Sequence, residues 1–462
     1  MDYFKKFLLS VFLISSLAHA SIEQAPPSFN VVGKRAIWTD FTHAKYELSF
    51  DIKTRKAKSV AIIELNIFEK GYPIFDVVGT PTKVLVNGVS YSQQEIETPG
   101  KESKVRIIDH EFKAGRYKIQ IESEVSNGVK FDASSVSAGF FMKDMRDREF
   151  LEMYIPSNYE YDQYKMEVSV RVTGSKKSHR LFTNGFLVEK SKNYFKYTYP
   201  DYFTSTSLYF HLAPEKKFKV LESVYETRLA NGKDFPVTIY SRTKRLNRRI
   251  IKVVRKVLIE LERDYGPWPH PHLIFYGDGK WKGGMEYAGA ATAGWFAIGH
   301  ELQHGYFARA VMPANGNAGW IDEAVASWRD FTVLHKIFPF RKDEINYTSM
   351  NLGNQSVFNR KTDHRSYVSG RSFMFYIDSL LKKVPGKSLK KFLKIYFENR
   401  KYTTIQSEDF RLDLEKYYGR SLKNLFDQYI YGRDIKNNSK LDGIHEKPFH
   451  EPLSHEVLQE LI

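Results

Sequence analysis

The sequence predicts a multidomain α+β protein, in which an N-terminal antiparallel β-domain precedes a domain that joins a mixed sheet to a helical half. Polar and apolar residues alternate from about residue 28 to 214, a period typical of half-buried strands. Helical periodicity dominates from residue 296 to about 431. The 462 residues, 42% of them hydrophobic, exceed the usual size of one domain and can bury more than one core.

The first twenty residues are expected to be a cleaved signal peptide. A short basic start precedes an apolar run from Phe7 to Leu17, and the segment ends in Ala-His-Ala at residues 18–20. The run is too short to span a bilayer as a stable helix. We therefore expect cleavage near Ala20-Ser21 and a periplasmic or secreted protein; a retained N-terminal anchor is the alternative.

Residues 21–214 are predicted to form the β-domain. Three of its alternating runs are Tyr46–Ile52, Ala61–Ile67 and Lys165–Val172. Asn-Gly pairs favour tight turns because both residues tolerate positive φ, and they occur at residues 87–88, 127–128 and 184–185. Short runs separated by such turns predict antiparallel strands.

The second domain is predicted to cover residues 215–435. It begins with two short strands, Val220–Leu229 and Pro236–Ser241. A helix follows from about Arg245 to Asp264 and ends before a Gly-Pro pair. Residues 436–462 show little periodicity and are expected to be a tail, whose three His-Glu pairs suit no helix face and favour an exposed segment over a second metal site.

Charge and cysteine content restrict the possible partners and sites. The net charge of +16 favours weak association of an exported protein with anionic envelope surfaces. The densest basic run, residues 242–256, has the spacing of an amphipathic helix with a solvated basic face, so we expect no nucleic-acid partner. The chain has no cysteine, which excludes thiol enzymes and cysteine-ligated metal sites. Any zinc site must use histidine, aspartate and glutamate.

Residues 300–304 read His-Glu-Leu-Gln-His, which fits the HExxH pattern. Positions i and i+4 lie one above the other on a helix, so His300 and His304 can reach one ion while Glu301 points beside it. The alternative is a polar face on an ordinary exposed helix.

A third ligand is expected from the next helix, which begins near Trp320. Glu323, nineteen residues after His304, is placed to return beside the histidines. Two histidines, one carboxylate and an open fourth position form the ligand set of hydrolytic zinc sites. Asp330 lies seven residues further along the same face and can accept the second ring N–H of a histidine ligand; the alternative is an ordinary surface acid.

This spacing, with Trp-Ile-Asp-Glu-Ala at residues 320–324, resembles the gluzincin aminopeptidases, the family of aminopeptidase N and leukotriene-A hydrolase. The resemblance covers nearly the whole mature chain and implies a β-domain followed by a thermolysin-like catalytic domain. It also implies one zinc ion on His300, His304 and Glu323, with Glu301 as the general base.

Two further segments carry the resemblance. The run of Gly283, Gly284, Met285 and Glu286 is similar to the family's GxMEN motif, which implies that these residues bind substrate and that the glutamate holds the free α-amine. The segment that begins at Ser366 is similar to the family's Tyr-x-Lys-Gly segment, which implies that Tyr367 donates to the tetrahedral oxyanion. A phenol suits that role because it stays protonated at neutral pH.

Some features depart from the family's pattern. Tyr287 replaces the asparagine of the motif, and the gap from Glu286 to His300 is shorter than expected, which indicates a trimmed loop beside the cleft. We also expect the family's large C-terminal helical domain to be absent. Three acidic residues lie near the place of the family's N-domain residue that also grips the amine: Asp147, Glu149 and Glu152.

The sequence therefore predicts an exported zinc aminopeptidase that removes N-terminal residues from peptides or proteins. A zinc endopeptidase or oligopeptidase on the same site is the first alternative, favoured by the trimmed loop and the missing C-terminal domain. The second is a non-catalytic envelope protein that binds peptides or glycans, against which the complete set of catalytic residue types argues. Side-chain preference and oligomeric state have no signature in the sequence.

Overall fold

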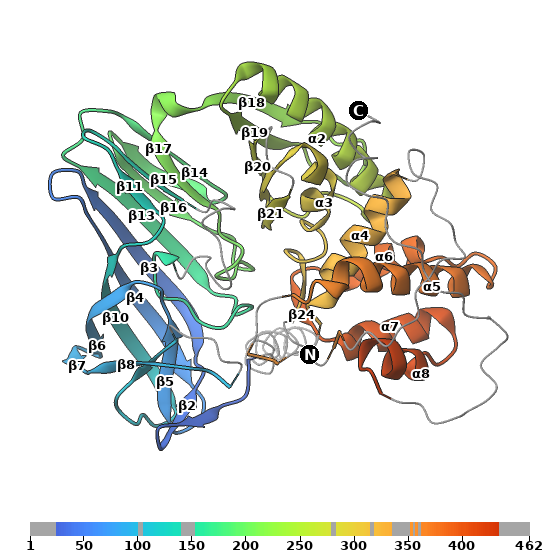
Figure 1. The fold of residues 1–462 in the computed structure, drawn as a ribbon, viewed down its shortest axis with the longest axis horizontal. Helices are drawn as coiled ribbons and strands as arrows, with labels where there is room; N and C mark the ends of the chain where they lie inside the picture. The colour runs from blue at the N-terminus through green and yellow to red at the C-terminus, as the bar shows by residue number, and fades with distance from the viewer. Residues whose placement is uncertain are drawn as a thin grey trace, which may run out of the picture.

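The computed structural model describes most of the chain (Figure 1). The described residues are 25–99, 105–139, 153–278, 283–314, 318–334, 352–353, 356–358 and 362–433. The predicted signal peptide, the predicted tail and the acidic residues Asp147, Glu149 and Glu152 lie outside them. No helix within these ranges is long and apolar enough to cross a membrane.

Three sheets build the N-terminal part of the fold, on the left of Figure 1. The eight-stranded sheet has the order β15 (Phe186–Ser191), β16 (Tyr194–Thr198), β13 (Lys165–Thr173), β3 (Asp40–Asp51), β4 (Lys56–Ile67), β10 (Gly115–Val125), β6 (Thr80–Val86) and β7 (Val89–Ser90). The five-stranded sheet has the order β1 (Phe29–Val31), β2 (Lys34–Ile37), β5 (Tyr72–Asp76), β9 (Val105–Ile108) and β8 (Gln93–Ile96). The four-stranded sheet has the order β11 (Val129–Phe131), β12 (Val136–Gly139), β17 (Phe210–Pro214) and β14 (His179–Thr183).

Most neighbouring strands in these sheets are antiparallel, as predicted, and the three alternating runs lie in β3, β4 and β13. Two pairs are parallel: β13 with β3, and β2 with β5. Alternate residues of β3, such as Tyr46, Leu48 and Phe50, are buried while their neighbours are exposed or half-buried. This is the pattern of a sheet with one face on a core.

The Asn-Gly pairs at residues 87–88 and 184–185 play different roles. Asn87-Gly88 closes the hairpin of β6 and β7, with φ of 49° and 85°. The second pair instead carries the chain from β14 to β15, which belong to different sheets. Asn184 is buried, and its side-chain amide donates to the carbonyl oxygens of Ser207 and Ala288, each at 2.7 Å. Asn184 therefore ties the N-terminal sheets to the second half of the chain.

A mixed sheet begins the second half. Its order is β18 (Lys219–Tyr225), β19 (Phe235–Ser241), β20 (Leu273–Gly277), β22 (Ala290–Ala293) and β21 (Gly284–Tyr287). The three central strands are parallel and the two outer ones antiparallel to their neighbours. Helix α2 (Lys244–Tyr265) packs on this sheet through Ile250, Val254 and Leu258, and its basic residues face solvent, as predicted. The helix ends at Gly266, whose φ of 113° favours glycine.

The helical half lies on the right of Figure 1. Its elements are η4 (Trp295–Ala297), α3 (Ile298–Gln303), α4 (Trp320–Leu334), the π-helical turn η5 (Ser366–Gly370), α5 (Arg371–Lys382), α6 (Leu389–Arg400), α7 (Ser407–Tyr418), α8 (Lys423–Leu425) and the π-helical turn η6 (Phe426–Ile430). A short 3-10 turn, η3 (Glu215–Lys217), lies between β17 and β18, and β23 (Val311–Pro313) pairs in parallel with β24 (Thr403–Ile405).

The N-terminal sheets and the mixed sheet share one hydrophobic core. Tyr240, Tyr276 and Tyr287 come from the mixed sheet or its edge, are almost fully buried, and belong to the core of the N-terminal strands. Phe182 of β14 stacks on Tyr240 with ring centroids 3.7 Å apart. The position of the mixed sheet, and of the residues at its edge, is therefore set by the β-sheets before it.

Candidate metal centre

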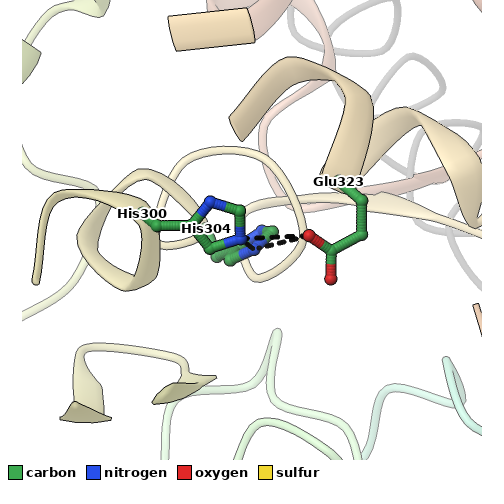
Figure 2. A group of neighbouring side chains, drawn as sticks. All are labelled: His300, His304 and Glu323. Carbon is green, nitrogen blue, oxygen red and sulfur yellow. Dashed lines mark hydrogen bonds and ion pairs between the residues drawn. The ribbon is translucent and has the colours of Figure 1, made fainter. Parts of the chain in front are cut away.

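Two helices bring the three predicted ligands together (Figure 2). His300 lies on α3, His304 follows at its C-terminal end, and Glu323 lies in the first turn of α4. The three side chains point toward one another. Gly305, just after the second histidine, leaves room for the ring of Trp268, because a Cβ here would lie under 3.0 Å from two of its atoms.

The spacing of the ligand atoms fits a zinc ion. The Nε2 atoms of His300 and His304 are 3.1 Å apart, and they lie 3.0 and 3.5 Å from Oε2 of Glu323. Ligand atoms held at about 2.0–2.1 Å from one tetrahedral zinc would be roughly 3.3 Å apart. Two imidazoles and a carboxylate are also the donor types that zinc prefers.

Both histidine rings are oriented through their second nitrogen. Nδ1 of His300 lies 2.7 Å from Oδ2 of Asp330, and Nδ1 of His304 lies 3.2 Å from the carbonyl oxygen of Phe307. A carbonyl only accepts, so Nδ1 of His304 carries the proton and Nε2 presents a lone pair. Two such lone pairs 3.1 Å apart repel each other unless a cation or a proton lies between them. The donor chemistry is therefore that of a metal site.

The surrounding carboxylates favour positive charge at the histidines. Burial disfavours a charged imidazole, but Glu323 and Glu286 outweigh it and raise the pKa of His304 to about 9. Burial also disfavours a charged Glu323, yet the two histidines outweigh it and lower the pKa of that carboxyl. A divalent cation bound among these groups would meet the same stabilising field.

Glu301 lies beside the ligands and is 6% exposed. Burial raises its pKa to about 8, although the nearby His300 opposes this. One carboxylate oxygen of Glu301 lies within 4.8 Å of a carboxylate oxygen of Glu286 and of a ring nitrogen of His304. Strand β21 packs directly on it: a Cβ at Gly284 would lie under 3.0 Å from three atoms of the Glu301 side chain. Glycine at this place leaves the space that Glu301 occupies.

Tyr367 reaches the centre from η5. Its hydroxyl donates to Oε1 of Glu323 at 2.5 Å, and its ring stacks on that of His300 with centroids 6.0 Å apart. Burial and then Glu323 raise the pKa of Tyr367, so the phenol stays protonated. Gly370 allows this approach, because a Cβ there would lie 2.8 Å from Cβ of Ala324 on α4.

The predicted substrate-binding segment forms β21, at the edge of the mixed sheet. The carbonyl of Gly283 accepts a hydrogen bond from the backbone of Gly294 at 2.9 Å, and Met285 packs against the N-terminal core. Glu286 points toward the centre, since one of its oxygens lies near Glu301 and His304. The structure therefore brings Gly284 and Glu286 to the centre, while Gly283 and Met285 hold the strand in place.

One residue of the centre was missed from the sequence. Arg309 is 4% exposed, and its Nη2 donates to Oε1 of Glu286 at 2.7 Å. Its Nη1 donates to Oγ1 of Thr206, in the segment before β17, at 2.8 Å. A signal was present: Arg309 is the only Lys, Arg, Asp or Glu between Glu301 and Asp322. A lone charge in an apolar run indicates a buried partner.

Comparisons with known proteins place the fold. Neither protein-family models nor curated protein sequences give a match. Among solved structures, an M1 zinc metallopeptidase from Deinococcus radiodurans matches with a TM-score of 0.62 and 13% identity over 93% of this chain and 99% of that chain. Native yeast LTA4 hydrolase matches with a TM-score of 0.62 and 13% identity, over 91% of this chain and 70% of that chain. A mutant of a two-domain M1 zinc metallopeptidase bound to L-arginine matches with a TM-score of 0.62 and 12% identity, over 87% of this chain and 96% of that chain. At these identities the similarity shows the fold, and the predicted fold class is confirmed.

Proposed function

We propose that this chain, which has the fold of the M1 zinc metallopeptidases, is itself a zinc-dependent aminopeptidase. One observation carries the proposal: the ligand atoms of His300, His304 and Glu323 lie 3.0–3.5 Å apart, and both rings are oriented by a second partner. The fold similarity supports it, because two of the matched structures are M1 zinc metallopeptidases.

His300, His304 and Glu323 would hold the ion, which when bound supplies a Lewis acid for the scissile carbonyl and lowers the pKa of a water molecule. Glu301 accepts the proton of the attacking water and passes it to the leaving amine. Its burial and raised pKa suit a group that both takes and gives a proton near neutral pH. Asp330 keeps the ring of His300 in register.

Two further groups act on the substrate. Tyr367 donates a hydrogen bond to the oxygen that becomes negative in the tetrahedral intermediate. In the structure its hydroxyl rests on Glu323, so it must turn from that carboxylate to the substrate. Glu286 pairs with the α-ammonium, which limits cleavage to the first peptide bond.

Glu301→Gln tests the chemistry. The variant should bind one equivalent of zinc, measured by elemental analysis, and lose at least about 1000-fold in kcat on an aminoacyl fluorogenic substrate, because an amide accepts no proton. Glu262→Gln is a matched control, since Glu262 is a buried glutamate on α2 that bonds to Tyr225 and Thr227. Retained turnover in Glu301→Gln, or no zinc in the wild type, would reject the proposal.

A peptide panel separates an aminopeptidase from an endopeptidase on the same centre. Peptides of one sequence are compared with free and acetylated N-termini, and products are identified by mass spectrometry. We expect stepwise loss of N-terminal residues from free peptides only. Internal cleavage of both forms would assign an endopeptidase or oligopeptidase, and zinc binding without cleavage would assign a non-catalytic receptor.

We also propose that the protein is exported and acts on peptides in the periplasm or outside the cell. The pattern of the first twenty residues supports this. N-terminal sequencing of protein from the envelope fraction should begin near Ser21. The exposed basic face of α2 supports weak binding to anionic envelope surfaces, which salt should reverse.

A further inference from the structure

The ion pair of Arg309 and Glu286 indicates how the carboxylate proposed to bind the substrate's α-ammonium is held in position. We propose that Arg309 is a positioning residue: it fixes Oε1 of Glu286 so that Oε2 meets the substrate's α-ammonium, and it thereby sets the preference for free N-termini. This inference rests on the proposed function. The structure gives Oε2 of Glu286 no hydrogen-bond partner among the described residues, and the side chain is 15% exposed, so that oxygen is open to a ligand.

Two anchors fix the guanidinium. Nη2 of Arg309 donates to Glu286 at 2.7 Å, while Nη1 donates to Oγ1 of Thr206 at 2.8 Å. Oγ1 of Thr206 lies 3.1 Å from Oγ1 of Thr204, so the threonine is itself held. A planar guanidinium with two fixed ends has one orientation. The position of the Glu286 carboxylate on β21 is therefore fixed relative to Thr206, in the N-terminal part of the fold.

Backbone hydrogen bonds also fix the position of Arg309 relative to the predicted metal ligands. The amide of Arg309 donates to the carbonyl oxygen of His304 at 3.0 Å, and that of Ala308 donates to Val311 at 2.9 Å. Ala308 has a φ of 140°, a conformation that L-residues rarely adopt. Such strain persists only where the surroundings fix the loop. One short loop thus sets the distance between the histidine nitrogens and the amine site.

Charge explains why a cation is needed here. Glu286 lies close to Glu301, and both Glu286 and Glu160 favour the charged form of Arg309. Without Arg309, Glu286 would lose the cation that is hydrogen-bonded to it, and no other hydrogen bond of its side chain among the described residues would fix Oε1 in its present place. Arg309 donates to Oε1, which leaves Oε2 of Glu286 available to an ammonium. At 4% exposed, Arg309 is itself too buried to receive a substrate carboxylate.

The test measures binding apart from turnover. In a Glu301→Gln background, the Kd values of a tripeptide and of its N-acetylated form are measured by calorimetry, with and without Arg309→Lys. We expect the free peptide to bind about 10-fold or more weaker after Arg309→Lys, since one charge-assisted contact is misplaced, and the acetylated peptide to be unchanged. In the active enzyme, KM for the free peptide should rise more than kcat falls. Arg329→Lys is the matched control, because Arg329 is 2% exposed and pairs with Glu260 away from the centre.

A double-mutant cycle decides whether Arg309 acts through Glu286. With Glu286→Gln in place, Arg309→Lys should cause no further loss of free-peptide binding. Thr206→Val removes only one of the two described hydrogen-bond partners of the guanidinium. It should change the ratio of the Kd values of the free and acetylated peptides in the same direction by a smaller factor. If Arg309→Lys fails to fold, this variant tests the role of Arg309 instead. Equal loss for free and acetylated peptides, additive losses, or no preference for the free peptide in the parent would overturn the inference. Absence of zinc or of all hydrolysis in the wild type would instead reject the proposed function. The Kd values of the free and acetylated peptides would still test whether Arg309 positions Glu286.

Discussion

Gly284→Ala should strongly reduce the proposed peptidase activity without unfolding the protein. The new Cβ would lie under 3.0 Å from three atoms of the Glu301 side chain, closer than real Cβ contacts come. Gly284 is not among the residues with positive φ, so its backbone accepts alanine. Glu301 would have to move by roughly 1 Å, and a misplacement of that size costs about 100-fold in rate. We therefore expect kcat to fall about 100-fold with zinc content unchanged.

Gly299→Ala is the matched control for this variant. Gly299 precedes His300, and a Cβ there would lie 3.8 Å from Asp330 and 3.9 Å from Val257, which is ordinary contact. Alanine in a helix also favours folding over glycine. Both variants are assayed for kcat on an aminoacyl fluorogenic substrate, for zinc by elemental analysis and for Tm. If Gly284→Ala retained more than a third of the wild-type kcat, the placement of Glu301 against β21 would be refuted.

Three further predictions follow, two from single contacts and one from the burial of two histidines. Asp330→Asn should weaken zinc binding about 10- to 100-fold, because the ring of His300 loses a charged partner; competition with a chelator measures this, and an unchanged affinity would reject the role. Tyr367→Phe should lower kcat by about 100-fold or more while zinc binding stays, and equal kcat would exclude the oxyanion role. Burial lowers the pKa of His211 and His270 to about 3 each, below the unfolded value. Their neutral forms therefore stabilise the fold above about pH 6.5, and this is lost as pH falls toward 3, by up to about 1.4 kcal/mol per pH unit for each histidine. Urea unfolding of the chelator-treated protein at pH 7.5 and 5.5 should show a smaller pH effect in His270→Gln, and an equal effect would contradict the argument.

Local patterns predicted the elements that carry the metal ligands. His300 and His304 are one helical turn apart, so their common face follows from the α-helix alone. Glu323 and Asp330 are likewise related by the period of a single helix, α4. The fold class followed from two periodicities, 2.0 and 3.6, each present over long segments. The metal-site roles of these residues stay proposals, but their proximity is a property of the structure.

What the sequence could not predict depends on contacts between distant segments. Arg309 meets Thr206 across 103 positions of the chain. The parallel pairing of β13 with β3 joins strands more than 100 residues apart, and no local pattern encodes such a partner. Asn184-Gly185 has the composition of a hairpin turn, yet the buried amide of Asn184 bonds to two other segments. The residue types at Asn184-Gly185 do not indicate whether the chain forms a hairpin or passes from one sheet to another.

The core that the N-terminal sheets share with the mixed sheet has a consequence for synthesis. Tyr240, Tyr276 and Tyr287 pack in the core of strands that the ribosome completes well before them. The first 214 residues therefore cannot close their hydrophobic core until about 75 more have been made. A nascent chain shorter than this keeps apolar surface open to water and to other chains. The N-terminal sheets therefore complete their apolar core only when the mixed sheet, which carries Gly284 and Glu286, has been made.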